Sequence, residues 1–466
     1  MNKLAILLLL VSVTLSAQEF GFGFGDDEET SGSGGGANSG ASGGGLSVSI
    51  GGEASASIVG YIDDFSKGAE HVSLGDILSG NITISAKTAA AEGIISLNIE
   101  PTAMPISIDE AYLRAFLGSF EIAAGLRKLT WGKADSFGPL DVINPLDTSQ
   151  IYTEMADNMS LMGVKIARPL VHASFRFGQF SKIEGVLIPN FEGHYIPREG
   201  RWVPAQMRML TNPEIPDGIL PDGTNLDDIV KVNDLPDTTT IDYAQAGLRF
   251  TTTIGSADIG VQYYYGRLPQ PAAKIRLVSF SPPSAEVDFL YNPYHQVGLD
   301  YAQVLLGFNT RVEVAANITE DLEGDDGSVY NPSIAWSFGF DRDLFLGINL
   351  NLQVNESIRL MHDKLGSDDF MSVATGNFDI EGGSKLTATR LTAALSRKFL
   401  RDKLELRAAV VWGIEDSDCL IMPALIWTKD DLCVALSGGF FTGNSEGQLG
   451  QYKDNNFLKV SLTYSF

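Results

Sequence analysis

Period-two alternation of apolar and polar residues is the feature that most constrains this chain. In residues 346–355 the even positions are Leu, Ile or Val, and the odd positions are Gly, Asn or Gln. Segments of about 8–14 residues with this pattern, separated by turn residues, recur from Leu46 to the end of the chain. Because successive side chains of a strand point to opposite faces, each segment predicts a strand with one apolar and one polar face.

Two architectures produce such strands. A soluble β-sandwich turns its apolar residues inward, whereas a membrane barrel turns them outward and lines its interior with polar residues. Two observations favour the barrel: the strands continue to Phe466 without a domain linker, and the chain begins with a secretory signal. A secreted sandwich or periplasmic binding protein is the alternative fold.

The N-terminal region has two parts that precede the strands. Lys3, an apolar stretch and the small residues before Gln18 predict a signal peptide over residues 1–17, and therefore export out of the cytoplasm. Residues 18–45 combine Phe-Gly pairs, an acidic cluster and a Gly/Ser-rich run. That composition cannot bury enough apolar surface to offset its ordering entropy, so we expect a disordered leader. The barrel is expected over residues 46–466.

The last strand carries a family resemblance. Counting back from the end, one face is apolar and the other holds Lys, Ser and Thr. This pattern, with its terminal Phe, resembles the C-terminal signature of bacterial outer-membrane proteins. The resemblance implies recognition by the barrel-assembly machinery through Leu458, Val460, Leu462, Tyr464 and Phe466. In a soluble protein a long apolar edge strand would invite aggregation, and barrel closure removes that edge.

The fold predicted is an all-β, transmembrane, antiparallel up-and-down barrel. Typical strand lengths give about 16 strands, within a range of about 14 to 18. Short turns at one end and long polar connections at the other, such as residues 191–240, 320–331 and 361–384, are typical of such barrels.

A second resemblance covers residues 108–152. An Asp-Glu-Ala-Tyr strand, an Arg-x-x-x-Trp-Gly strand end and an Asn-Pro-x-Asp loop follow one another there, and this order resembles porin-like outer-membrane families. About 30 residues rich in Asp, Asn, Gly and Pro separate two predicted strands from the alternation that resumes at Met162. This loop either folds into the lumen, or lies outside and only makes turns. In the first case a constriction would be lined by Trp131, Asp135, Asp141, Asn144 and Asp147.

Inward-facing charges are the candidates for solute selectivity, because charged rings set pore preference. The acidic candidates are Glu110, Glu121, Asp300, Glu313 and Glu405. The basic candidates, which outnumber them, are Arg114, Arg127, Lys165, Arg176, Arg249, Arg311, Arg390 and Arg407. One hypothesis is a lumen that favours anionic or polar solutes. The other is that these charges pair across neighbouring strands and brace the wall.

Composition narrows the remaining functions. A net charge of -25 makes nucleic acid an improbable partner. The five His residues lack metal-ligand spacing, and no cofactor motif is present. Residues 443–447 match the Gly-x-Ser-x-Gly pattern of nucleophilic serines, but no helix follows, so we expect no enzyme.

Cys419 and Cys433 are expected on adjacent strands, with Cys433 opposite Ile426. At that register the two thiols are too far apart to form a disulfide.

These observations predict an outer-membrane, porin-like channel for passive diffusion of small polar or anionic solutes. Its partners would be outer-membrane lipids, the assembly machinery and the solutes. A homotrimer is compatible with the resemblance, although the sequence shows no protomer interface. The alternative is a barrel-anchored surface adhesin or binding protein with a plugged lumen, in which the long loops form the active surface.

Overall fold

The computed structural model describes residues 45–62, 72–73, 78–100, 106–135, 137–205, 207–208, 230–280, 283–364 and 385–466. The predicted signal peptide, residues 1–17, lies outside the described residues, and so does the predicted leader up to residue 44. The first described strand begins at Ser47.

The described chain is almost entirely β-structure. Among the described residues no helix is both long and apolar enough to cross a membrane. The short helical elements are α2 (Ile151–Asn158), η2 (Met162–Val164), η4 (Ile241–Tyr243), η5 (Phe345–Gly347) and η6 (Gly450–Tyr452). The strands are β1 (Ser47–Tyr61), β2 (Val72–Ser73), β3 (Ser79–Lys87), β4 (Ala91–Ile99), β5 (Ser107–Leu117), β6 (Phe120–Arg127), β7 (Arg168–Phe177), β8 (Ser181–Ile188), β9 (Val230–Val232), β10 (Gln245–Ile254), β11 (Ala257–Arg267), β12 (Ala272–Phe280), β13 (Pro283–Leu290), β14 (Pro293–Leu305), β15 (Phe308–Thr319), β16 (Ser333–Asp343), β17 (Ile348–Arg359), β18 (Thr387–Phe399), β19 (Leu404–Gly413), β20 (Asp418–Lys429), β21 (Leu432–Gly443) and β22 (Phe457–Ser465).

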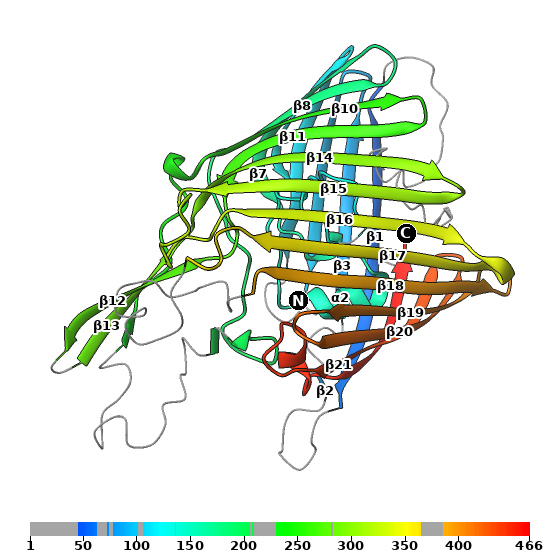
Figure 1. The fold of residues 1–466 in the computed structure, drawn as a ribbon. Coiled ribbons are helices and arrows are strands. Elements are labelled where there is room, and N and C mark those ends of the chain that lie inside the picture. The colour runs from blue at the N-terminus through cyan, green and yellow to red at the C-terminus, as the bar shows by residue number, and fades with distance from the viewer. Residues whose placement is uncertain are drawn as a thin grey trace, which may run out of the picture.

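Sequential antiparallel pairing closes all of these strands except β2, β9, β12 and β13 into one barrel (Figure 1). The barrel has 18 strands, at the upper end of the range that the sequence predicted. Closure comes from β1 and β22, which pair from Glu53↔Ser465 to Tyr61↔Phe457. The backbone N–H groups of Gly52 and Phe466 each donate to the other residue's carbonyl at 2.9 Å, which extends the closing ladder to the C-terminus.

The apolar face of the barrel is the outer one. On β22, Leu458, Val460 and Leu462 are between 43% and 52% exposed, whereas Lys459 and Ser461 face the interior and are buried. On β17, Gln353 is 1% exposed and lies on the inner face. An apolar surface with a polar interior is what a transmembrane barrel requires, because lipid offers no partner to polar groups.

Connections of very different length separate the two ends of the barrel. One end carries tight turns between consecutive strands, including residues 118–119, 255–256, 306–307 and 430–431, and both termini of the barrel. The other end carries the connections over residues 128–167, 189–244, 268–292 and 320–332. In Figure 1 the long connections lie at the left, where β12 and β13 extend beyond the barrel wall. These two strands and β9 form a separate small sheet.

Candidate functional site

The connection between β6 and β7, residues 128–167, enters the barrel and contacts its inner wall. Glu313 on β15 is 1% exposed, and its carboxylate accepts hydrogen bonds from the backbone N–H groups of Lys133, Ala134 (2.7 Å) and Leu140 (3.3 Å). A Cβ atom on Gly132 or Gly138 would lie 2.4 or 2.6 Å from a Glu313 carboxylate oxygen, so only glycine permits this approach. Glu313, predicted as pore-lining, therefore holds the loop.

Three glutamines of the wall hold the same stretch through its carbonyl groups. Gln262 on β11 donates to Leu140 O at 2.9 Å, Gln296 on β14 to Pro139 O at 2.9 Å, and Gln353 on β17 to Phe137 O at 2.6 Å. Sequence reasoning missed these glutamines because it selected only charged inward positions. Their signal was available, since each occupies a polar position in an alternating strand.

Several of the inward arginines are paired with carboxylates. Arg311 Nη1 lies 2.9 Å from Asp135 of the inward loop and 2.8 Å from Asp341 on β16. Arg249 on β10 pairs with Asp300 on β14 at 2.9 Å and lies 3.7 Å from Glu184 on β8. Such buried pairs satisfy charges that would otherwise be costly, and they join neighbouring strands and the loop.

A smaller charged group lines β5 to β7. Arg114 lies 3.3 Å from Glu121, and Glu110 accepts the backbone N–H of Lys128 at 2.7 Å. Arg127 stacks over the Tyr112 ring, 4.9 Å from its centroid, and contacts His172 at 3.1 Å. These contacts fix the point at which the chain leaves β6 and enters the lumen.

The remaining basic candidates have different environments. Arg407 on β19 donates to the carbonyl groups of Ala156 and Asp157 at the end of α2, and Glu405 is buried on the same strand. Arg390 on β18 lines a cavity of about 70 Å³ beside α2, and Arg176 is exposed near the β7–β8 turn.

The constriction candidates serve mainly to shape the loop. Trp131 is 3% exposed and packs against apolar residues of the wall. Asn144 accepts the backbone N–H of Leu129 at 2.7 Å and donates to Ile166 O at 2.9 Å, so it ties together the two ends of the loop. Asp147 accepts from the backbone N–H of Ser149 at 2.9 Å.

Asp141 contacts Lys165 rather than an open lumen. Their charged atoms are 2.6 Å apart, and Lys165 also donates to the Thr130 hydroxyl at 2.7 Å. Lys165 follows η2 and lies inside the loop, so the expectation that alternation resumes at Met162 is wrong. The wall resumes at Arg168, the first residue of β7.

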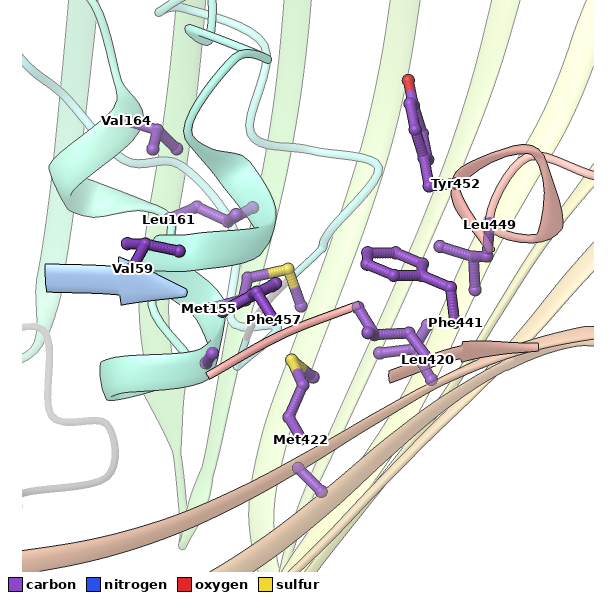
Figure 2. Packing of buried hydrophobic residues seen from close by; sticks show 13 residues of the cluster. Val59, Met155, Leu161, Val164, Leu420, Met422, Phe441, Leu449, Tyr452 and Phe457 are labelled. Atoms are coloured by element: carbon purple, nitrogen blue, oxygen red, sulfur yellow. The ribbon is translucent and has the colours of Figure 1, made fainter. Parts of the chain in front are cut away.

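Helix α2 fixes the far end of the loop against the opposite wall. Asp157 pairs with Lys459 on β22 at 2.6 Å and accepts from Ser437 on β21 at 2.5 Å. Figure 2 shows the apolar contact beside these polar ones: Met155 of the helix lies near Met422 and Phe457, whose side chains project inward from the wall. The loop therefore reaches across the lumen.

A second segment, residues 189–205, also lies against the inward loop. The Trp202 ring is 5.5 Å from that of Tyr152, and Tyr452 donates to Trp202 O at 3.4 Å. His194 Nδ1 accepts the backbone N–H of Leu146 at 2.9 Å, which requires a neutral imidazole. Burial lowers the pKa of His194 to about 4, so the ring keeps this form at neutral pH.

A cavity of about 160 Å³ lies between these two segments and the wall. Its lining includes Arg168, Glu192, His194, Gln245 and Tyr294. Arg168 and Glu192 form an ion pair across it. Among the residues that the structure describes, no group of His, Cys, Asp and Glu is arranged to hold a metal ion.

The terminal strand residues singled out by sequence all point outward. Leu458, Val460, Leu462, Tyr464 and Phe466 are each at least 37% exposed. Tyr464 and Phe466 stack at 6.4 Å between ring centroids. Together they form an apolar strip beside the seam where β22 meets β1.

Comparison with known proteins supports the architecture. No protein-family model matches the sequence, and no curated protein matches it. The fold is similar to the crystal structure of OccK8 (OprE) from Pseudomonas aeruginosa, with a TM-score of 0.50, 9% identity, and coverage of 90% of this chain and 98% of that one. A BenF-like porin from Pseudomonas fluorescens Pf-5 gives a TM-score of 0.50 and 8% identity over the same shares of the two chains. At these identities the similarity shows the fold, a closed porin-type barrel.

Proposed function

We propose that this chain is an outer-membrane channel through which small polar or anionic solutes diffuse passively. The observation that carries the proposal is a closed 18-stranded barrel with an apolar outer face, polar inner strands and a loop folded into its lumen. A loop bound at mid-wall by Glu313 narrows a pore without requiring any catalytic group. The proposal is therefore a transport role and not an enzymatic one.

The membrane and assembly steps belong to the same proposal. The signal peptide would be cleaved on export, and the apolar outer face would contact outer-membrane lipids. The strip from Leu458 to Phe466 would be read by the barrel-assembly machinery before β22 pairs with β1. A homotrimer remains part of the proposal because porin-type barrels often associate in that way.

The charge selectivity of the channel depends on which inward arginines are neutralised by ion pairs. Pairing of Arg114, Arg249 and Arg311 with carboxylates favours a bracing role for these residues. Arg176 and Arg390 form no ion pair with another described residue, so they are the stronger candidates for attracting anions. Reversal potentials under a salt gradient test this. An anion preference of up to about threefold that falls in Arg390→Gln supports it, and a clear cation preference contradicts it.

Liposome swelling tests the channel itself. Proteoliposomes that hold the mature chain should swell in isosmotic sugars at rates that fall with sugar size, because the loop limits the pore. Heat-denatured protein is the control. A correctly folded, heat-modifiable barrel that passes no sugar would contradict the proposal.

One observation favours a second function, a surface-binding barrel with a closed lumen. Tyr152, Trp202 and Phe441 pack together where α2 and residues 189–205 meet the wall, and this cluster obstructs part of the mouth. The β12–β13 hairpin extends beyond the barrel and would form the binding surface (Figure 1). Absent swelling together with retained binding to cells or glycans would select this function.

A further inference from the structure

We propose that solutes cross the barrel along one side only, over a wall of uncharged polar residues on β1, β3 and β4, and that the pathway favours uncharged hydroxylated solutes such as small sugars and polyols. This inference rests on the channel function proposed above. The wall, called here the neutral wall, consists of Ser55, Asn81, Thr83, Ser85 and Asn98.

The inward loop is held on the other side of the lumen. The hydrogen bonds that fix residues 133–140 run to β11, β14, β15 and β17. Polar contacts of residues 156–157 run to β19, β21 and β22, and Val59 at the far end of β1 lies in the same apolar cluster as Met155. In the order of strands around the barrel, β15 to β17 lie across the lumen from β3 and β4. Among the described residues, the contacts of the loop therefore extend from β11 round to β22 and the end of β1, and none of them runs to β3 or β4.

Burial of the inner side chains follows this division. Beneath the loop, Gln262, Gln296 and Glu313 are each 1% exposed. On the neutral wall, by contrast, all five residues remain partly exposed, although Ser57 on β1 and Ser96 on β4, which also point inward, are buried. Their inward direction follows from strand alternation, since Ile58 on β1 and Ile84 on β3 are exposed on the outer face. The space beside the neutral wall is thus the part of the lumen that solvent reaches.

The chemistry of this wall is that of hydroxyl and amide groups bonded to one another. Asn81 donates to Ser96 at 2.8 Å and to Asn98 at 2.9 Å, and Thr83 donates to Asn81 at 3.1 Å. Ser55 shares a hydrogen bond of 3.2 Å with Thr463 on the neighbouring β22. Such groups both donate and accept, so they can exchange hydrogen bonds with the hydroxyls of a passing solute at little desolvation cost.

Two pairs of opposite charges lie next to this wall. Glu92 lies 3.7 Å from Lys87, and Arg114 lies 3.3 Å from Glu121. Since rings of one charge sign produce ion selectivity, a paired set should produce little of it. Glu53, which shares the inner face of β1 with Ser55 and is exposed, adds a single carboxylate beside the wall, and one carboxylate is not the ring of charges that sets ion selectivity.

Thiol labelling tests the pathway. On a Cys419→Ser, Cys433→Ser background, Thr83→Cys is compared with Ser337→Cys, which is 2% exposed on β16 under the loop. A water-soluble, bulky methanethiosulfonate should label Thr83→Cys in proteoliposomes and at least halve its ribose swelling rate. Ser337→Cys should stay unlabelled and keep its rate. Labelled Thr83→Cys with unchanged flux, or a labelled and blocked Ser337→Cys, would overturn the pathway.

Ion permeability tests the solute class. The ratio of K⁺ to Cl⁻ permeability in the background protein should stay within about threefold of unity, and Thr83→Asp and Thr83→Lys should move it in opposite directions. A ratio on the order of ten or more in either direction would overturn the neutral class. If the background protein passes neither ribose nor ions, the channel function fails first, and the pathway fails with it.

Discussion

Replacement of Glu313 by Ala should release the inward loop from the wall. The carboxylate accepts three backbone N–H groups of the loop, one of them at a longer 3.3 Å. A hydrogen bond to a charged acceptor contributes about 1.5–3 kcal/mol. Two full bonds give about 3–6 kcal/mol. Asp300, which lies directly opposite Glu313 on β14, offsets up to about 1 kcal/mol of this, because removing Glu313 relieves like-charge repulsion.

The expected change in loop opening follows from these values. A loss of about 2–6 kcal/mol corresponds to a rise in the open fraction of about thirtyfold to about twenty-thousandfold. Amide hydrogen exchange of peptides that cover residues 128–147 measures it, because protection falls with the free energy of local opening. Glu313→Gln keeps one acceptor oxygen and should fall between wild type and Glu313→Ala.

The matched control is Glu286→Ala on the β12–β13 hairpin, which removes an exposed pair with Arg276 and touches no part of the loop. It should leave exchange over residues 128–147 unchanged. If Glu313→Ala leaves protection of the loop at the wild-type level in a barrel that still shows heat-modifiable mobility, Glu313 does not hold the loop against the wall.

Three further predictions concern the mouth, the thiols and the seam. The pKa of His194 is lowered to about 4, so its contribution to holding residues 189–205 is complete above its ordinary pKa of about 6.5. The stabilisation of residues 189–205 against local opening falls by about 3 kcal/mol as the pH falls from 6.5 towards 4, because the charged His194 ring cannot accept from Leu146. Hydrogen exchange of residues 189–205, corrected for intrinsic rates, should therefore show faster opening at low pH. His194→Asn should remove this pH dependence. Cys433 faces the lumen and Cys419 the outer surface, so a water-soluble thiol reagent should label Cys433 alone, and intact mass should show no disulfide. Deletion of Phe466 should lower the heat-modifiable fraction after refolding; an unchanged fraction would show that the seam does not depend on it.

Alternation in the sequence predicted the architecture because strand period and burial are local properties. Residues 348–355 show it plainly, and the structure confirms a strand there. The number of strands was harder to predict because β1 presents Gly52, Ala54 and Ala56 on its outer face. These small residues give weak alternation between apolar and polar positions. Leu346 belongs to the preceding turn, with a φ of 64°, and not to the strand as predicted.

Registers and loop positions were harder to predict because they depend on turns and distant contacts. Cys433 lies opposite Thr428 and not Ile426, since the turn is the tight pair Asp430 and Asp431. A two-residue shift at the turn moves every partner along the strand. The inward course of residues 128–167 depends on Glu313, which no local pattern near the loop reveals.

Conductance in a planar lipid bilayer tests the central claim most directly. The barrel is narrowed by a wall-bound loop but open beside β1, β3 and β4. Each insertion should therefore give a discrete step in current, and the channel should stay open as the voltage is raised. Glu313→Ala should give larger and noisier steps. Heat-modifiable, membrane-inserted protein that carries no current, in the wild type and in Glu313→Ala alike, would contradict the account and indicate a closed lumen.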